Sequence, residues 1–191
     1  MKLIGLSGTN GSGKDSVGHM LAERHGWLFV SGSEILREEV KERGLSIERE
    51  NLRNVSAEWR RESGLGVLID KAVEIYNVSD SEYKGLVIAS LRNPGEADRV
   101  HELGGTVVWT DAEPEVRFER INKRMRGDED RKTFAQFMAE EQAEMQRSGD
   151  AATLDMAGVK AKADVFIANN SNEIGYFREQ ADQSLKKVIS L

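Results

Sequence analysis

A glycine-rich loop between an apolar run and a helical pattern constrains this chain more than any other feature. The apolar run is Leu3-Ile4-Gly5-Leu6, and the loop is Gly8-Thr9-Asn10-Gly11-Ser12-Gly13-Lys14-Asp15-Ser16. Glycine adopts positive φ without a steric penalty, so such a loop can curl tightly. A curled loop that opens a helix directs several N–H groups at one point, where the helix dipole adds roughly half a positive charge. The loop is therefore expected to bind a polyphosphate.

The spacing G-x-x-x-x-G-K is that of a P-loop, in which the lysine adds a mobile positive charge. The predicted nucleotide-binding residues are Gly8, Thr9, Asn10, Gly11, Ser12, Gly13, Lys14, Asp15 and Ser16. In the usual motif a Ser or Thr hydroxyl follows the lysine and meets Mg²⁺, whereas here Asp15 follows and Ser16 comes next. Two interpretations of Asp15 stay open. It joins Ser16 as a magnesium ligand, partly through water, or it only stabilises the first helical turn.

Composition excludes several classes of protein. The chain has 191 residues with 27 basic and 33 acidic side chains, a net charge of −6, which argues against a nucleic-acid-binding surface. It has no cysteine, so disulfides and thiolate-bound metals are excluded. We see no secretory signal and no apolar run of membrane length, and therefore expect a cytoplasmic protein. The length fits one domain over 1–191, as a monomer or homodimer.

Short apolar segments alternate with helical patterns along the chain. The predicted strands are 3–7, 27–30, 85–89, 106–110 and 163–168. The predicted helices are 14–24, 31–44, 48–76 with a break near Gly64 and Gly66, 94–103, 113–125, 134–145 and 174–189. This alternation predicts an α/β protein with a five-stranded parallel sheet flanked by helices, a three-layer P-loop NTPase fold. The helical excursion at about 32–76 and the insert at about 126–153 exceed what a minimal sheet needs.

Several arginines follow the predicted strands, where ligands bind in open α/β sheets. Arg37 lies one turn into the helix after the second strand, and Arg92 lies just past the third. Arg120 and Arg124 follow the fourth strand and share a helix face. Phosphoryl transfer needs such positive groups around the donor, the acceptor and the transferred group. Any single arginine could equally be a solvated surface charge, but placement at strand ends favours function for Arg92 and for the Arg120/Arg124 pair.

These segments resemble the nucleoside monophosphate kinases, the adenylate-kinase-like group, and the prokaryotic kinases labelled dephospho-CoA kinase-like. Ser31-Gly32-Ser33-Glu34-Ile35-Leu36-Arg37 is similar to their S-x-G-D-L-L-R, and Leu91-Arg92-Asn93-Pro94-Gly95-Glu96 resembles a segment that holds the acceptor phosphate. Glu119-Arg120-Ile121-Asn122-Lys123-Arg124 resembles D-R-I-x-x-R, whose arginines line the donor side.

The resemblance implies a role for each matching residue. The acceptor-binding residues would be Ser31, Arg37, Arg92 and, as a reader of the acceptor base, Glu96. The catalytic residues would be Lys14, Arg120, Arg124 and Arg126, and Arg131 would contact ATP. The segment at about 32–76 would be a helical acceptor-binding insert, and the segment at about 126–153 a lid.

The leading functional hypothesis is an ATP-dependent kinase that uses Mg²⁺ and phosphorylates a small phosphorylated acceptor, above all a nucleoside monophosphate. A phosphate acceptor needs no general base, in agreement with the absence of an obvious catalytic histidine. Dephospho-CoA kinase is the alternative; its hydroxyl acceptor calls for an acid after the second strand, where Glu34 is the nearest. A nucleotide-binding regulatory protein without activity stays open, because Asp15 is unusual and Ala89-Ser90 stands where many relatives carry an Asp.

Three further expectations concern structure rather than chemistry. Glu140, Glu141 and Glu144 are predicted to form a solvated helix face. The three tryptophans are expected in the core rather than as base-stacking platforms, with Trp59 as the one possible exception because it lies in the acceptor-side helices. Each of the two prolines, Pro94 and Pro114, is expected in the first turn of a helix.

Overall fold

Five parallel strands form the centre of the structure, a computed structural model that describes residues 1–79, 82–124, 132–146 and 149–190. The strands are β1 (Leu3–Gly8), β2 (Leu28–Ser31), β3 (Leu86–Ala89), β4 (Thr106–Asp111) and β5 (Val165–Ala168). Their order in the sheet is β2-β3-β1-β4-β5, and every pair is parallel. The chain therefore leaves β1 at the centre of the sheet, where the strand order reverses and ligands bind in such folds.

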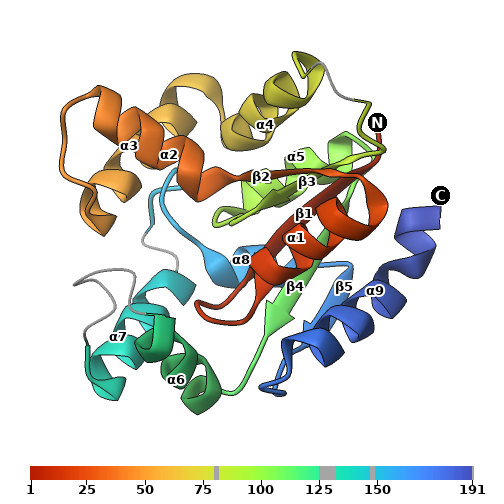
Figure 1. Cartoon of the computed structure of the whole chain (residues 1–191). Coiled ribbons are helices and arrows are strands. Elements are labelled where there is room, and N and C mark those ends of the chain that lie inside the picture. Colours follow the sequence, from red (N-terminus) through yellow and green to blue (C-terminus); the bar gives the residue numbers. More distant parts are fainter. Residues whose placement is uncertain (80–81, 125–131, 147–148, 191) are drawn as a thin grey trace.

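Helices cover both faces of the sheet and make three layers (Figure 1). They are α1 (Lys14–His25), α2 (Gly32–Glu42), α3 (Arg49–Ser63), α4 (Val67–Asn77), α5 (Pro94–Glu102), α6 (Pro114–Arg124), α7 (Phe134–Met145), α8 (Met156–Ala161) and α9 (Ile174–Ser190). One face packs against α1 and α9 around Leu6, Met20 and Phe177. The other packs against α4, α5 and α8 around Ile88 and Trp109.

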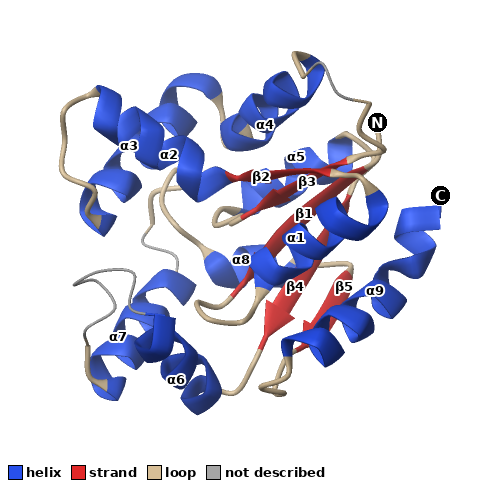
Figure 2. Cartoon of the chain, in the orientation of Figure 1, coloured by secondary structure: helices blue, strands red, loops and turns tan. Residues whose placement is uncertain are grey.

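Two helical excursions lie beyond the carboxyl ends of the strands (Figure 2). One is α2 and α3, which share with the start of α4 a small core that includes Val40, Val55 and Trp59. The other is the pair α6 and α7, joined by aromatic contacts between Phe118 and Phe137. The mouth of the P-loop therefore lies between two helical units.

The predicted fold class is confirmed, with all five strands near their expected positions. Both prolines begin helices, α5 and α6, and all three tryptophans are buried. The sequence analysis missed α8, which has only six residues. The side chain of Asp155 caps this helix by accepting a hydrogen bond from the amide of Gly158. Two of its side chains, Met156 and Val159, are buried. Six residues are too few for a helical period to be visible.

Candidate active site

The P-loop has the backbone geometry that its glycines predict. Gly8 ends β1 at φ 149° and Gly13 precedes α1 at φ 97°. A Cβ at Gly8 would collide with the carbonyl oxygen of Thr110, and one at Gly13 would lie 2.5 Å from Nδ2 of Asn169. Among the described residues no side chain caps α1. The amino end of α1 therefore has the open backbone N–H groups that suit an anion.

The side chains of Thr9 and Ser12 in the loop are hydrogen-bonded to other parts of the protein. Thr9 Oγ1 donates to Asp111 at 2.7 Å, and Ser12 Oγ lies 2.8 Å from the hydroxyl of Thr110. Asn169 donates through Nδ2 to the carbonyl of Ser12 at 2.8 Å. The loop is thus fixed from outside by β4 and by the segment after β5. Thr9 and Ser12, which were predicted to bind the nucleotide, can do so through their backbone.

Asp111 at the end of β4 is the main anchor of this arrangement. Burial alone would raise its pKa, but hydrogen bonds from Thr9, Trp109 and the amide of Ala112, with the charge of Lys160, lower the pKa below its usual value. Asp111 therefore stays ionised and holds Thr9.

A cavity of about 330 Å³ lies beside the P-loop and brings together predicted site residues from distant parts of the sequence. The predicted residues that line it are Asn10, Lys14, Asp15, Ser31, Arg37 and Arg92. They come from the P-loop, from α2 and from the loop after β3, so three separate segments of the sequence meet in one place. Arg37 is paired with Glu34 at 2.7 Å. Ser31 caps α2 by accepting from the amide of Glu34, at a long 3.4 Å.

Three arginines of this cavity, Arg49, Arg53 and Arg60, were not predicted from the sequence, and Arg60 is buried and paired with Glu96. Arg49 and Arg53 lie four residues apart on α3 and line the cavity together with Arg92. No motif marks them, since α3 is rich in charge along its whole length. Their four-residue spacing matches that of Glu140 and Glu144 on α7, and this complementary pattern was the signal available in the sequence.

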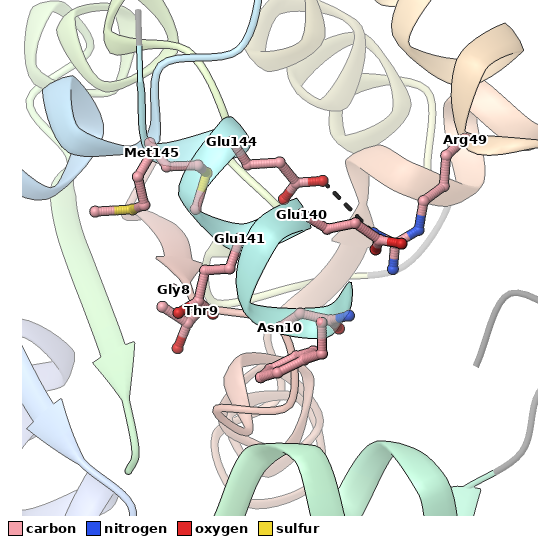
Figure 3. Close-up of a pocket in the computed structure, with 10 residues that line it drawn as sticks. Gly8, Thr9, Asn10, Arg49, Glu140, Glu141, Glu144 and Met145 are labelled. Carbon is pink, nitrogen blue, oxygen red and sulfur yellow. Dashed lines mark hydrogen bonds and ion pairs between the residues drawn. The ribbon is translucent and has the colours of Figure 1, made fainter. Parts of the chain in front are cut away.

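The acidic face of α7 is the largest correction to the sequence analysis. Glu140, Glu141 and Glu144 were predicted to be solvated, but they face the P-loop and α3 (Figure 3). The side chains of Glu141 and Glu144 are only 17% and 14% exposed, whereas that of Glu140 is 42% exposed, as predicted. Glu140 accepts from Arg49 at 3.0 Å, and Glu144 accepts from Arg53 at 2.8 Å and from Arg92 at 2.6 Å. The space left between α7 and Gly8–Asn10 is about 20 Å³, room for little more than one water.

Arg117 and Glu141 attach the other side of α7. Arg117 is buried beneath α7, donates through Nη2 to Glu141 at 2.8 Å and through Nε to the carbonyl of Ala112 at 2.7 Å. Arg117 is therefore a packing residue between β4 and α7, because its donors are directed at protein acceptors.

The predicted role of Glu96 as a reader of the acceptor base is wrong. Its side chain is 1% exposed, and both carboxylate oxygens are occupied. Oε1 accepts from Arg60 at 2.7 Å, and Oε2 accepts from the backbone amides of Arg92 and Asn93 at 2.7 and 3.2 Å. Glu96 completes a capping box with Asn93 at the start of α5. The sequence Asn-Pro-Gly-Glu already carried this cap, since an Asn followed three residues later by Glu is its signature.

Arg120 lies outside the cavity, on the far side of the P-loop. It donates to the carbonyls of Gly11 at 3.3 Å and Ser171 at 2.7 Å, and to the side chain of Asn169 at 3.3 Å. Burial lowers its pKa, opposed in part by Glu119. Arg120 thus clamps the P-loop to the segment after β5. The other predicted catalytic or ATP-contacting arginines fall outside the description: Arg126 and Arg131 lie beyond the described residues, as does the side chain of Arg124.

The residues beside Lys14 fit a magnesium ion. Asp15 lines the cavity, and its Oδ1 is the one buried side-chain oxygen in the described part of the chain that lacks a hydrogen-bond partner. A carboxylate oxygen left open at a phosphate site suits Mg²⁺ or one of its waters. Ser90 adopts φ 78° and lines the same cavity at the end of β3. Such strained conformations concentrate at functional sites.

Comparison with known proteins places the chain in a family. Residues 4–147, most of the chain, match the AAA_18 family, described as an AAA domain. The chain belongs to the AAA_18 family. This AAA_18 chain is 28% identical to a UPF0200 protein of Methanococcus maripaludis, over 100% of both chains. It is 29% identical to UPF0200 proteins of Pyrobaculum aerophilum, with 99% of this chain and 97% of the relative covered, and of Thermococcus kodakarensis, with 98% and 96% covered.

A shikimate kinase and a gluconokinase are among the solved structures with a similar fold. The AAA_18 chain matches shikimate kinase from Bacteroides thetaiotaomicron with a TM-score of 0.61 at 15% identity, over 99% of this chain and 98% of that one. A gluconokinase from Sinorhizobium meliloti matches with a TM-score of 0.57 at 16% identity, over 99% and 94%. The fold is therefore that of the P-loop kinases. Within the described residues, no helix has the length and apolarity that a membrane crossing requires.

Proposed function

We propose that this chain is an ATP-dependent phosphotransferase that moves the γ-phosphate of ATP to a small phosphorylated acceptor, with a nucleoside monophosphate as the favoured class. One observation carries the proposal. A single cavity is lined by Lys14 of the P-loop and by several arginines, among them Arg37, Arg49, Arg53 and Arg92. Lys14 is suited to bind a donor phosphate, and the arginines are suited to bind an anionic acceptor, as transfer between two phosphates requires.

Each residue has a defined task in this proposal. The backbone of the P-loop and Lys14 bind the donor phosphates, and Asp15 with Ser16 holds Mg²⁺ partly through water. Mg²⁺ supplies charge neutralisation on the donor phosphates when bound. Arg37, Arg49, Arg53 and Arg92 orient the acceptor. Arg120 acts through the carbonyl of Gly11, which keeps the loop in place. No residue has to remove a proton, because a phosphate acceptor is already an anion.

Dephospho-CoA kinase activity is the second candidate, because its acceptor also carries phosphate groups that the arginines could bind. Its nucleophile is a hydroxyl and calls for an acidic base. Glu34, the nearest acid after β2, is paired with Arg37 and 61% exposed, which makes it a poor base. This observation favours transfer to a phosphate over transfer to a hydroxyl.

The test is ADP release from ATP and Mg²⁺ with a panel of acceptors. The panel contains the nucleoside monophosphates, dephospho-CoA, and shikimate and gluconate as substrates named for the structural neighbours. We expect stimulation by a nucleoside monophosphate. Stimulation by dephospho-CoA alone selects the second candidate. Tight ATP binding without stimulation by any acceptor contradicts the proposal and indicates a nucleotide-binding regulatory protein.

Replacement of Asp15 tests the magnesium assignment. In Asp15→Asn we expect the Mg²⁺ concentration for half-maximal turnover to rise about 10-fold, the usual effect of removing one outer-sphere carboxylate. Asp98→Asn, at an exposed aspartate paired with Lys162, is the matched control and should titrate like the unaltered protein. Equal turnover of Asp15→Asn and the unaltered protein at every Mg²⁺ concentration would leave Asp15 with a role in the first turn of α1 only.

A further inference from the structure

Glu144 lies at the meeting point of three arginines. Its carboxylate is 2.6 Å from Nη1 of Arg92, 2.8 Å from Nη2 of Arg53 and 3.6 Å from Nη1 of Arg49. The Glu144 side chain is only 14% exposed. The arginines belong to two separate elements, α3 and the loop after β3, so their convergence is a property of the folded site and not of one helix.

The convergence has the chemistry of an oxyanion site. Guanidinium groups bind carboxylate and phosphate oxygens through similar paired N–H donors, so a cluster that holds one can hold the other. Arg49, Arg53, Arg92 and Glu144 all line the cavity that contains Lys14. The carboxylate of Glu144 therefore lies among Arg49, Arg53 and Arg92, the arginines that an anionic acceptor would contact.

The charges explain why a carboxylate occupies this place. Arg49, Arg53 and Arg92 would repel one another without an anion among them, and the carboxylate of Glu144 lies close to all three. Burial alone would raise the pKa of Glu144, but the charges of Arg92, Arg53 and Arg49 outweigh burial and lower that pKa to about 2. Glu144 is thus ionised at neutral pH and supplies negative charge between the three arginines.

We propose that Glu144 is an internal surrogate for the anionic group of the acceptor: its carboxylate fills a subsite for a phosphate or carboxylate formed by Arg49, Arg53 and Arg92, and the acceptor binds by exchanging with it. The inference rests on the proposed function and extends it, since it makes Glu144 of α7 a competitor of the acceptor for Arg49, Arg53 and Arg92. Binding of the acceptor then frees the end of α7 that carries Glu144.

Inorganic phosphate is the probe, titrated by calorimetry in the absence of nucleotide. An internal competitor that fills a site for nine-tenths of the time weakens the apparent affinity about 10-fold. We therefore expect Glu144→Gln, which keeps the shape and removes the charge, to bind phosphate about 10-fold more tightly than the unaltered protein. Glu179→Gln, at an exposed glutamate paired with Arg24, is the matched control and should show no gain.

A second variant separates this subsite from the P-loop, which also binds phosphate. In the double variant Glu144→Gln/Arg53→Gln the gain should disappear, because charged hydrogen bonds of this kind are worth about 10-fold or more in affinity. A gain that survives the loss of Arg53 would place the phosphate on the P-loop and overturn the inference. Unchanged or weaker phosphate binding in Glu144→Gln would also overturn it, since Glu144 would then only be a scaffold for the arginines.

A measurement on the unaltered protein covers the case in which Glu144→Gln does not fold. Saturating phosphate should speed amide hydrogen exchange in α7, and slower or unchanged exchange there contradicts the exchange of Glu144 for the ligand. Failure of the proposed function has a different signature. A protein that gains phosphate affinity in Glu144→Gln but transfers no phosphoryl group to any acceptor keeps the subsite and loses the kinase assignment.

Discussion

Turnover of Lys14→Ala should fall by about 10³-fold, while the protein keeps its fold. Lys14 begins α1 and lines the cavity beside Asn10 and Asp15. In phosphoryl transfer the protein contributes mostly positioning and positive charge, so removal of the lysine of the P-loop removes stabilisation that appears only in the transition state. The backbone geometry of the loop depends on its glycines and on β4, and alanine is compatible with the first turn of a helix.

The measurement is ADP release with the best acceptor of the panel, together with a thermal melt of each protein. Lys162→Ala is the control, because Lys162 forms an exposed pair with Asp98 far from the cavity. An unchanged melting temperature with lost turnover assigns the effect to chemistry. Turnover of Lys14→Ala within a few-fold of the control would remove the P-loop from the reaction and leave it as a binding element.

The sheet and the P-loop could be read from the sequence because both are local patterns. Each strand is a short apolar run, and the loop is a fixed spacing of glycines with a lysine at its end. The break between α3 and α4 follows from Gly64, which sits at φ 96°. The six residues of α8 escaped because nothing periodic fits into so short a segment, and its stability comes from Met156 and Val159 packing into the core.

The acceptor side could be predicted only in part, because it is assembled from distant segments. Arg37 and Arg92 stand in short motifs, but Arg49 and Arg53 acquire meaning only when α7 is packed against α3. The same packing overturned the assignment of Glu141 and Glu144 on α7. An acidic stretch of helix is usually solvated, and only the tertiary structure shows Glu144 among three arginines. Charge pairing between distant helices is thus the part of the site that local patterns leave out.

Glu96→Ala should destabilise the protein by about 3–5 kcal/mol, because it leaves the guanidinium of Arg60 buried without its counter-ion. The pair is 2.7 Å apart with both side chains 1% exposed. The remaining acceptors of Arg60 are neutral, the hydroxyl of Ser56 and the carbonyl of Ala152. Alanine also removes the cap that Glu96 provides to the amides of Arg92 and Asn93.

Urea unfolding and thermal melts measure this loss, which corresponds to roughly 10 °C or more in a chain of this size. Glu96→Gln keeps an oxygen for the cap and loses only the charge, so its loss should be smaller than that of Glu96→Ala. Glu102→Ala is the matched control, since Glu102 is 62% exposed and pairs with Arg99 on the same helix; we expect a change within about 0.5 kcal/mol. Equal unfolding midpoints for Glu96→Ala and Glu102→Ala would contradict the assignment of a buried structural pair.

The same substitution should reach the acceptor site, which separates Glu96 from a residue that only stabilises the core. Glu96 fixes the backbone amide of Arg92, and its partner Arg60 joins α3 to the carbonyl of Ala152. The positions of Arg92 after β3 and of Arg49 and Arg53 on α3 therefore depend on these hydrogen bonds. We therefore expect Glu96→Ala, at a temperature where it is folded, to raise the KM for the acceptor more than the KM for ATP, because the P-loop is held by β4 and not by this network. An equal rise in both would mean that the loss of stability spreads through the whole protein.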